Sequence, residues 1–221
     1  MDRVRAFANM GLARAHMRQI KGLRFWKLCG SGTGEGFTPI PNTGVYSILA
    51  VWPDLETARK QMATSKAYDS FRKHAAESWT VFLNPVSVRG TWSGVEPFIA
   101  TDSPIDGPIA ALTRASIRPE KAIQFWQRVP NISTVIGADK NVAFKIGIGE
   151  LPLLHQVTFS IWPDTKSMAE FARADGPHAK AIRAVRDGNW FREELYARFK
   201  VVDDSGTWNG EKPLQDLEYA A

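Results

Sequence analysis

One histidine of this sequence, His178, has a setting that could place it against a cofactor. It follows the helix-breaking pair Gly176-Pro177, and a proline suits the first turn of a new helix. On that helix His178 would share one face with the apolar residues three, four and seven positions later. The positive end of the helix dipole keeps the imidazole neutral, as a metal ligand must be. The pattern fits an axial ligand of haem, which one protein histidine can hold, or a core histidine hydrogen-bonded to backbone.

A second histidine, His155, could hold the same group from a strand. It alternates with Val157, Phe159 and Ile161, so all four side chains would lie on one strand face. If that face is buried, His155 is the runner-up axial ligand of the iron. It could instead be a catalytic residue that faces the haem from the sheet as a hydrogen-bond partner.

Basic and aromatic side chains complete the candidate site. Lys145, Arg183 and Arg192 are candidates to pair with haem propionates, although such cations are usually just solvated. Lys145 is also, with His155, a catalytic candidate, and Trp190 is expected to contact the cofactor. The aromatic residues expected to line a dry, apolar substrate pocket are Phe144, Phe159 and Trp162.

Other kinds of chemistry lack a supporting pattern. His16 and His74 lie among basic residues and are expected to be solvated. No Ser/His/Asp set, no histidine pair at metal spacing and no facial triad can be assembled. The glycine-rich run from Gly30 to Gly36 is not followed by the Lys-Ser or Lys-Thr pair of a phosphate-binding loop. It is expected to be a wide turn that brings backbone close to a cofactor edge or, equally, a long hairpin loop.

The elements that must position these residues occur twice. A strand, a Trp-Pro-Asp turn and a helix begin at Ile48 and again near Phe159. Three tryptophan pairs keep nearly the same spacing of 110, 111 and 116 positions: Trp52 and Trp162, Trp79 and Trp190, Trp92 and Trp208. Small insertions of this size are typical of an old duplication.

Each copy predicts the order β-α-β-β-α-β, which is the ferredoxin-like pattern. The expected fold class is α+β, with duplicated ferredoxin-like units that form a dimeric α+β-barrel type of fold. The first unit would be residues 1–94, the linker 95–108, and the second unit, with the haem site, 109–221. No strand is predicted before Asp2, so the first unit is expected to lack its first strand. The residue 111 positions before His178 is Ala67, so only the second unit has a histidine at this place.

Composition indicates an ordinary globular protein. The chain has 221 residues, of which 44% are hydrophobic and 23% charged. Its net charge of +5 is dispersed, which argues against a nucleic-acid partner and favours weak attraction to acidic proteins or a membrane surface. Cys29 is the single cysteine, so internal disulfides and cysteine-ligated clusters are excluded and a reducing compartment is favoured. The sequence shows no apolar run long enough to span a bilayer and no apolar core of a signal peptide. The expected location is therefore cytoplasmic, and this is compatible with peripheral contact with a membrane.

Several long strings resemble the spheroidene monooxygenase family. They are KLCGSGTGEGFTP (27–39), AESWTVFL (76–83), FKIGIGE (144–150), LLHQVTFSIWPD (153–164), GPHAKAIRAVR (176–186) and WFREELYARF (190–199). The resemblance extends over nearly the whole chain. It implies a haem-dependent monooxygenase of carotenoid biosynthesis that uses haem b, dioxygen and an electron donor such as ferredoxin. Members of that family oxidise an acyclic carotenoid end group at C2, first to a hydroxyl and then to a ketone.

Three other interpretations stay open. One is a haem enzyme of the same fold with dehydratase or peroxidase-like activity on another small apolar substrate. Another is a non-catalytic protein that binds haem or a hydrophobic ligand. The third is an α+β-barrel monooxygenase without a cofactor. The sequence is compatible with an oligomer but does not indicate one.

Overall fold

The computed structural model describes residues 13–104, 106–127, 141–173 and 188–217. In chain order its elements are β1 (Phe25–Gly32), β2 (Pro41–Val51), α2 (Leu55–Thr64), α3 (Lys66–Arg72), β3 (Trp79–Gly90), β4 (Ile109–Ile117), the short 3-10 helix η1 (Pro119–Lys121), β5 (Phe144–Gly149), β6 (His155–Trp162), α5 (Thr165–Arg173) and β7 (Phe191–Gly206). Short helical segments also cover 13–17 and 122–127.

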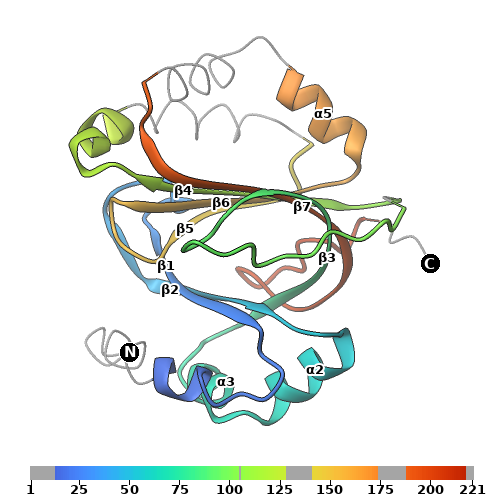
Figure 1. Cartoon of the computed structure of the whole chain (residues 1–221). Coiled ribbons are helices and arrows are strands. Elements are labelled where there is room, and N and C mark those ends of the chain that lie inside the picture. The colour runs from blue at the N-terminus through green and yellow to red at the C-terminus, as the bar shows by residue number, and fades with distance from the viewer. Residues whose placement is uncertain (1–12, 105, 128–140, 174–187, 218–221) are drawn as a thin grey trace.

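The strands of this part of the chain form one curled antiparallel sheet. Their order is β2-β1-β5-β6-β4-β7-β3. The sheet curls round an interior, with α2 and α3 outside one side of it and η1, 122–127 and α5 outside the other (Figure 1). The fold is therefore a mixture of helices and an antiparallel sheet, as the α+β prediction required.

Strands from both halves of the chain join in this single sheet, with the four strands of the second half side by side between β1 and β3. β1 pairs with β5, and β3 pairs with β7. Residues 25–90 supply three of the described strands and residues 109–206 supply four. β2 and β3 are the two end strands and are not hydrogen-bonded to each other.

The Trp-Pro-Asp turns begin helices as the sequence indicates. The Asp54 carboxylate accepts a hydrogen bond from the Thr57 backbone N–H at 2.7 Å, which caps α2. Asp164 accepts from the Ser167 N–H at the same distance, at the start of α5. These backbone hydrogen bonds hold the pKa of both carboxyls below the usual range.

The bounds of β3 and β7 differ from those that the sequence predicts. The sequence of residues 79–88 predicts a strand interrupted at Pro85, whereas β3 continues to Gly90, because a register shift beside this proline accommodates its missing N–H. The sequence predicts a last strand over residues 194–202, whereas β7 begins earlier at Phe191 and ends later at Gly206. Its whole length pairs with β4 and β3, and this tertiary pairing is invisible to local patterns.

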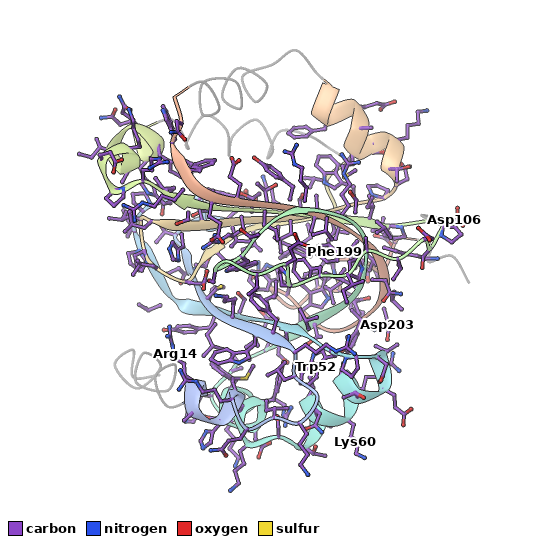
Figure 2. All side chains as sticks on the ribbon, viewed as in Figure 1. Arg14, Trp52, Lys60, Asp106, Phe199 and Asp203 are labelled. Atoms are coloured by element: carbon purple, nitrogen blue, oxygen red, sulfur yellow. The ribbon has the colours of Figure 1, made fainter. Side chains whose placement is uncertain are left out.

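The main core fills the interior of the curled sheet. Alternate residues of β4, β6 and β7 supply most of it, and Phe199, labelled in Figure 2, packs edge-to-face on Phe98 of the segment after β3. Smaller apolar clusters lie on the outer face, beneath α3 on one side and beneath 122–127 and α5 on the other. The sheet thus has two buried faces, and each strand residue belongs to one or the other.

Candidate functional site

The two faces of the sheet separate residues that the sequence grouped together. Phe144 and Phe159 face the interior, where their ring centroids lie 6.5 Å apart. Trp162 lies on the outer face and packs against Met168 and Phe171 of α5. The three aromatic residues expected to line one pocket therefore do not share a face.

The two catalytic candidates are also on opposite faces. Lys145 lies on the outer face, between the interior residues Phe144 and Ile146, and its Nζ pairs with Glu35 Oε2 at 2.6 Å. His155 shares the interior face with Val157. The structure does not bring Lys145 and His155 together.

His155 stands in a charged part of the interior. Its Nδ1 is buried without a hydrogen-bond partner and lies 3.6 Å from Glu150 Oε2. Burial is the largest influence and lowers the pKa of this imidazole, against the opposing effect of the Glu150 carboxylate. The ring is therefore neutral at pH 7.

Beside His155 lies an ion-pair network that the sequence reasoning missed, here named the interior charged cluster: Lys27, Arg114, Glu150 and Glu193. The Arg114 side chain is only 1% exposed and pairs with Glu193, while Lys27 Nζ lies 2.8 Å from Glu150 Oε1. Trp92 covers the cluster: its Nε1 donates to Glu150 Oε2 at 2.7 Å, and Arg114 lies 5.6 Å from its ring centroid. The available signal was a lone arginine inside the apolar strand Ile109–Ile117.

Glu193 is held ionised by a set of donors. It accepts from the Thr91 hydroxyl at 2.9 Å and from the backbone N–H groups of Ser93 and Gly94 at 3.1 and 2.7 Å. Burial by itself would raise the pKa of this carboxyl, but these hydrogen bonds and the one from Arg114 outweigh it and lower the pKa to about 2. Glu193 therefore stays charged throughout the neutral range.

The outer face carries a different kind of surface, here named the outer-face floor. Two adjacent rows of the ladder across β5, β6 and β4 form it: Gly147, Thr158 and Thr113, then Lys145, Ser160 and Ala111. Apart from Lys145, these side chains are small, so the surface is flat. η1, 122–127 and α5 lie on this side of the sheet (Figure 1).

The glycine-rich run covers the Gly147 end of the outer-face floor, since a Cβ on Gly147 would lie 2.5 Å from Gly36 O. Its first three residues end β1, and the rest opens the hairpin loop between β1 and β2, in line with one of the two expectations. The Gly147 N–H donates to Glu35 O at 2.8 Å, and Ser31 Oγ donates to Gly147 O at 2.8 Å. The loop backbone thus rests directly on the β5 backbone, and Glu35 from the same loop holds Lys145.

This contact predicts a specific effect of replacing Gly36 by alanine. A Cβ at Gly36 would lie 1.9 Å from Gly147 O, and its φ of +88° already disfavours an L side chain. The matched control is Gly34→Ala, because Gly34 has a φ of +65° but open space around the added atom. We expect Gly34→Ala to cost about 1–2 kcal/mol of backbone strain and Gly36→Ala to cost clearly more. Thermal unfolding of both variants checks this, and equal shifts in Tm would contradict the packing of this loop on β5.

The remaining cofactor candidates have different surroundings. Trp190 is 5% exposed and packs with Phe37, Ile117 and Phe125 beneath 122–127. Arg192 is exposed at the start of β7. His178 and Arg183 lie outside the described residues.

The two faces differ in how well they suit a haem. In the interior, Trp79, Phe144 and Trp208 pack in contact, with centroid separations of 4.5 and 5.5 Å. An iron at His155 Nδ1 would also displace the Glu150 carboxylate, which already binds Lys27 and Trp92. The outer-face floor, by contrast, carries small side chains apart from Lys145, and helices lie on its side of the sheet (Figure 1), which suits a planar macrocycle better. Within the part of the chain that the structure describes, no group of three or more His, Cys, Asp or Glu could hold a bare metal ion.

Comparison with known proteins identifies the family. No family model matches the chain. Spheroidene monooxygenase of Cereibacter sphaeroides is 53% identical over 214 residues, which are 96% of this chain and 66% of that protein. Its namesake from Rhodobacter capsulatus is 53% identical over 211 residues, 94% of this chain and 87% of that protein. The chain belongs to the spheroidene monooxygenase family.

A more distant relative agrees with this assignment. The spheroidene monooxygenase of Rubrivivax gelatinosus is 35% identical over 191 residues, 86% of this chain and 73% of that protein. The resemblance drawn from the sequence strings is thus confirmed. The chain spans 66% of the length of the Cereibacter sphaeroides relative.

One solved structure supports the fold independently of sequence. An aldoxime dehydratase in complex with butyraldoxime superimposes with a TM-score of 0.52 at 9% identity, over 92% of this chain and 77% of that one. At this identity the likeness concerns the fold alone.

Among the described helices, none has the length and apolar character needed to cross a bilayer.

Proposed function

We propose that this chain is a haem-dependent monooxygenase that oxidises the end group of an acyclic carotenoid of the spheroidene type. The observation that carries the proposal is 53% identity to a spheroidene monooxygenase over 96% of this chain. Identity of this extent includes both faces of the sheet and the loops around them. The proposed reaction proceeds at C2, first to a hydroxyl and then to a ketone.

The outer-face floor is the proposed seat of haem b. Its flat surface suits the macrocycle, and His178, which belongs to the stretch after α5, is the proposed axial ligand. Arg183 and Arg192 are the proposed partners of the propionates. When bound, haem supplies the chemistry of dioxygen activation, with electrons from a donor such as ferredoxin.

The residues of this chain have separate tasks in that reaction. Trp162, Met168 and Phe171 form an apolar wall between the sheet and α5, which suits a hydrocarbon and excludes water. Lys145 belongs to the floor, and its Nζ lies 2.6 Å from Glu35 Oε2, so this ion pair fixes the position of the side chain. In each cycle one atom of dioxygen is inserted into a C–H bond. The other atom is reduced to water with two electrons and two protons. Two cycles at one carbon give a geminal diol, which loses water to form the ketone.

We also propose that the fold arose by duplication of a ferredoxin-like unit, which gives the dimeric α+β-barrel arrangement within one chain. A repeated carboxylate cradle supports this. Glu193 accepts from Thr91, Ser93 and Gly94, as described above. Glu77, 116 positions earlier, accepts from Thr207 Oγ1, Asn209 N and Gly210 N at 3.1, 2.7 and 3.0 Å. The same three-donor turn thus occurs once in each half.

The proposed partners follow from charge and from the substrate. A net charge of +5 favours weak association with an acidic electron donor such as ferredoxin. A cytoplasmic location with peripheral membrane contact would give access to a carotenoid dissolved in lipid.

The test is a visible absorption spectrum of the full chain expressed with haem supply, followed by turnover of spheroidene with dioxygen and reduced ferredoxin. We expect an intense Soret band that disappears in His178→Ala and persists in His155→Ala. We also expect hydroxylated and keto products only from the haem-loaded protein. A folded protein with a Soret band and no product would indicate a haem-binding protein or another haem chemistry. A folded protein without the band would overturn haem dependence.

A further inference from the structure

The turn that joins β5 to β6 exposes large apolar side chains. Residues 151–154 are Leu-Pro-Leu-Leu, and the first three are exposed, with Leu151 and Leu153 each at 46%. Consecutive exposed apolar residues are avoided on protein surfaces unless they serve a contact. Leu153 also has a φ of +67°, which is unfavourable for a bulky side chain and is found where function maintains it. The turn is therefore a candidate contact surface.

The short helix 122–127 continues this surface. Its Trp126 Nε1 donates to Leu153 O at 2.9 Å, so the helix and the turn lie side by side. Ile123, one helical turn before Trp126, is 76% exposed. The set that these segments expose is here named the apolar rim: Ile123, Trp126, Leu151, Pro152 and Leu153. It lies at one end of β5 and β6, which supply four of the six residues of the outer-face floor, and its helix is on the same side of the sheet as that floor (Figure 1).

The backbone of the turn suits an apolar medium. Leu151 O accepts from His155 N at 3.0 Å, and Leu153 O accepts from the Trp126 indole. Pro152 has no N–H that could be left unpaired. Because hydrocarbon offers no hydrogen bonds, a segment that enters it must pair its polar groups internally. These contacts thus lower the cost of placing the turn in lipid.

Two cations border the apolar rim. Arg118 and Lys121 lie at the two ends of η1, and neither forms an ion pair with a described carboxylate. Arg118 Nε is also buried without a hydrogen-bond partner. One exposed carboxylate, Glu120, lies between them, whereas Glu150 at the start of the turn is bound to Lys27 in the interior charged cluster. The border therefore carries an excess of positive charge, which complements the phosphate groups of an anionic lipid surface.

We propose that the apolar rim docks the protein on an anionic lipid bilayer. Ile123, Leu151 and Leu153 would enter the boundary between headgroups and acyl chains, and Arg118 and Lys121 would lie among the phosphate groups. The inference deepens the proposed function and rests on it, because a carotenoid dissolved in lipid would then reach the chain beside the outer-face floor. A turn and six helical residues offer little area for a stable protein interface, which takes about 800 Å² from each partner, whereas a bilayer accepts a few protruding side chains.

Flotation of the full chain with lipid vesicles tests the proposal. The vesicles are phosphatidylcholine with about one quarter phosphatidylglycerol, and phosphatidylcholine alone should bind the chain more weakly. Ile123→Gln and Leu153→Asn are each expected to weaken binding about tenfold, the effect of one large aliphatic side chain that is no longer buried. Both variants should fold, since glutamine suits an exposed helical position and asparagine tolerates a positive φ. Ile99→Gln is the matched control and should leave affinity unchanged, because Ile99 is 75% exposed in the segment after β3.

A fluorescent label reports which surface meets the lipid. The single cysteine of the chain, Cys29, is buried, so an environment-sensitive dye attaches only where a second cysteine is introduced. The emission of the dye on Ile123→Cys is expected to shift to the blue when vesicles are added. The same dye on Ile99→Cys should not respond.

The outcomes separate the proposal from its rivals. Absence of flotation, or flotation that neither Ile123→Gln nor Leu153→Asn weakens, would overturn it. A dimer in light scattering that dissociates in Ile123→Gln would assign the apolar rim to a second copy and would also overturn it. The Soret band and the turnover of carotenoid dispersed in detergent require no vesicles, and both rim variants should retain them. Failure of the proposed function is therefore distinguishable from failure of the lipid contact.

Discussion

Replacing Arg114 by methionine is expected to destabilise the protein by about 3–5 kcal/mol, the usual cost of removing one member of a buried ion pair. Methionine keeps much of the side-chain length but leaves the Glu193 carboxylate without its cation. It also removes the guanidinium that lies 5.6 Å from the Trp92 ring centroid. With Arg114 1% exposed, water cannot replace the lost partner.

Urea unfolding followed by tryptophan fluorescence measures this effect. The double variant Arg114→Met with Glu193→Gln should recover part of the loss, because no unpaired charge then remains in the interior. Arg59→Met is the matched control, since Arg59 forms an ion pair with Asp203 whose side chains are 54% and 41% exposed. That variant should change the free energy of unfolding by about 1 kcal/mol or less. Equal losses in Arg59→Met and Arg114→Met would show that the interior charged cluster does not stabilise the fold.

The same residue shows where prediction from sequence ends. The apolar run Ile109–Ile117 predicts a strand with these bounds, and β4 has the same bounds. Its arginine carried no local sign of a partner, because Glu193 is 79 positions away in the chain. The pairing depends on the register between β4 and β7, and register is a tertiary property. Local sequence patterns were thus enough to predict this strand. The interior charged cluster could be found only once the order and the register of the strands were known.

Only the structure shows which of the candidate residues lie on which face of the sheet. Alternation correctly grouped His155, Val157 and Phe159 on one side of β6. The sequence could not indicate that this side is the filled interior, or that Lys145 faces the opposite way on the neighbouring strand. Nor could it show that the glycine-rich loop rests on Gly147, since the contact joins segments more than 100 positions apart. Which face could hold a cofactor depends on packing and not on the identity of any one residue.

The choice of face leads to the second large effect, expected for Thr158→Trp on the outer-face floor. Thr158 lies between Gly147 and Thr113 in the ladder, at the middle of the flat surface. An indole there would stand where the proposed macrocycle lies, so we expect haem affinity to fall by at least about tenfold and the Soret band to be lost. Thr158 is only partly buried, so the free energy of unfolding should change little.

Thr158→Ser is the size-matched control and should retain the band, because it keeps the hydroxyl and removes one methyl group. Titration of haem into each purified variant gives the affinity, and urea unfolding of the same samples separates lost binding from lost folding. A normal Soret band in Thr158→Trp, together with its loss in His155→Ala, would contradict the outer-face site. Such a result would require the interior to rearrange, because an iron near His155 must displace Glu150 from its contacts with Lys27 and Trp92. The two variants therefore decide between the faces whichever residue proves to be the axial ligand.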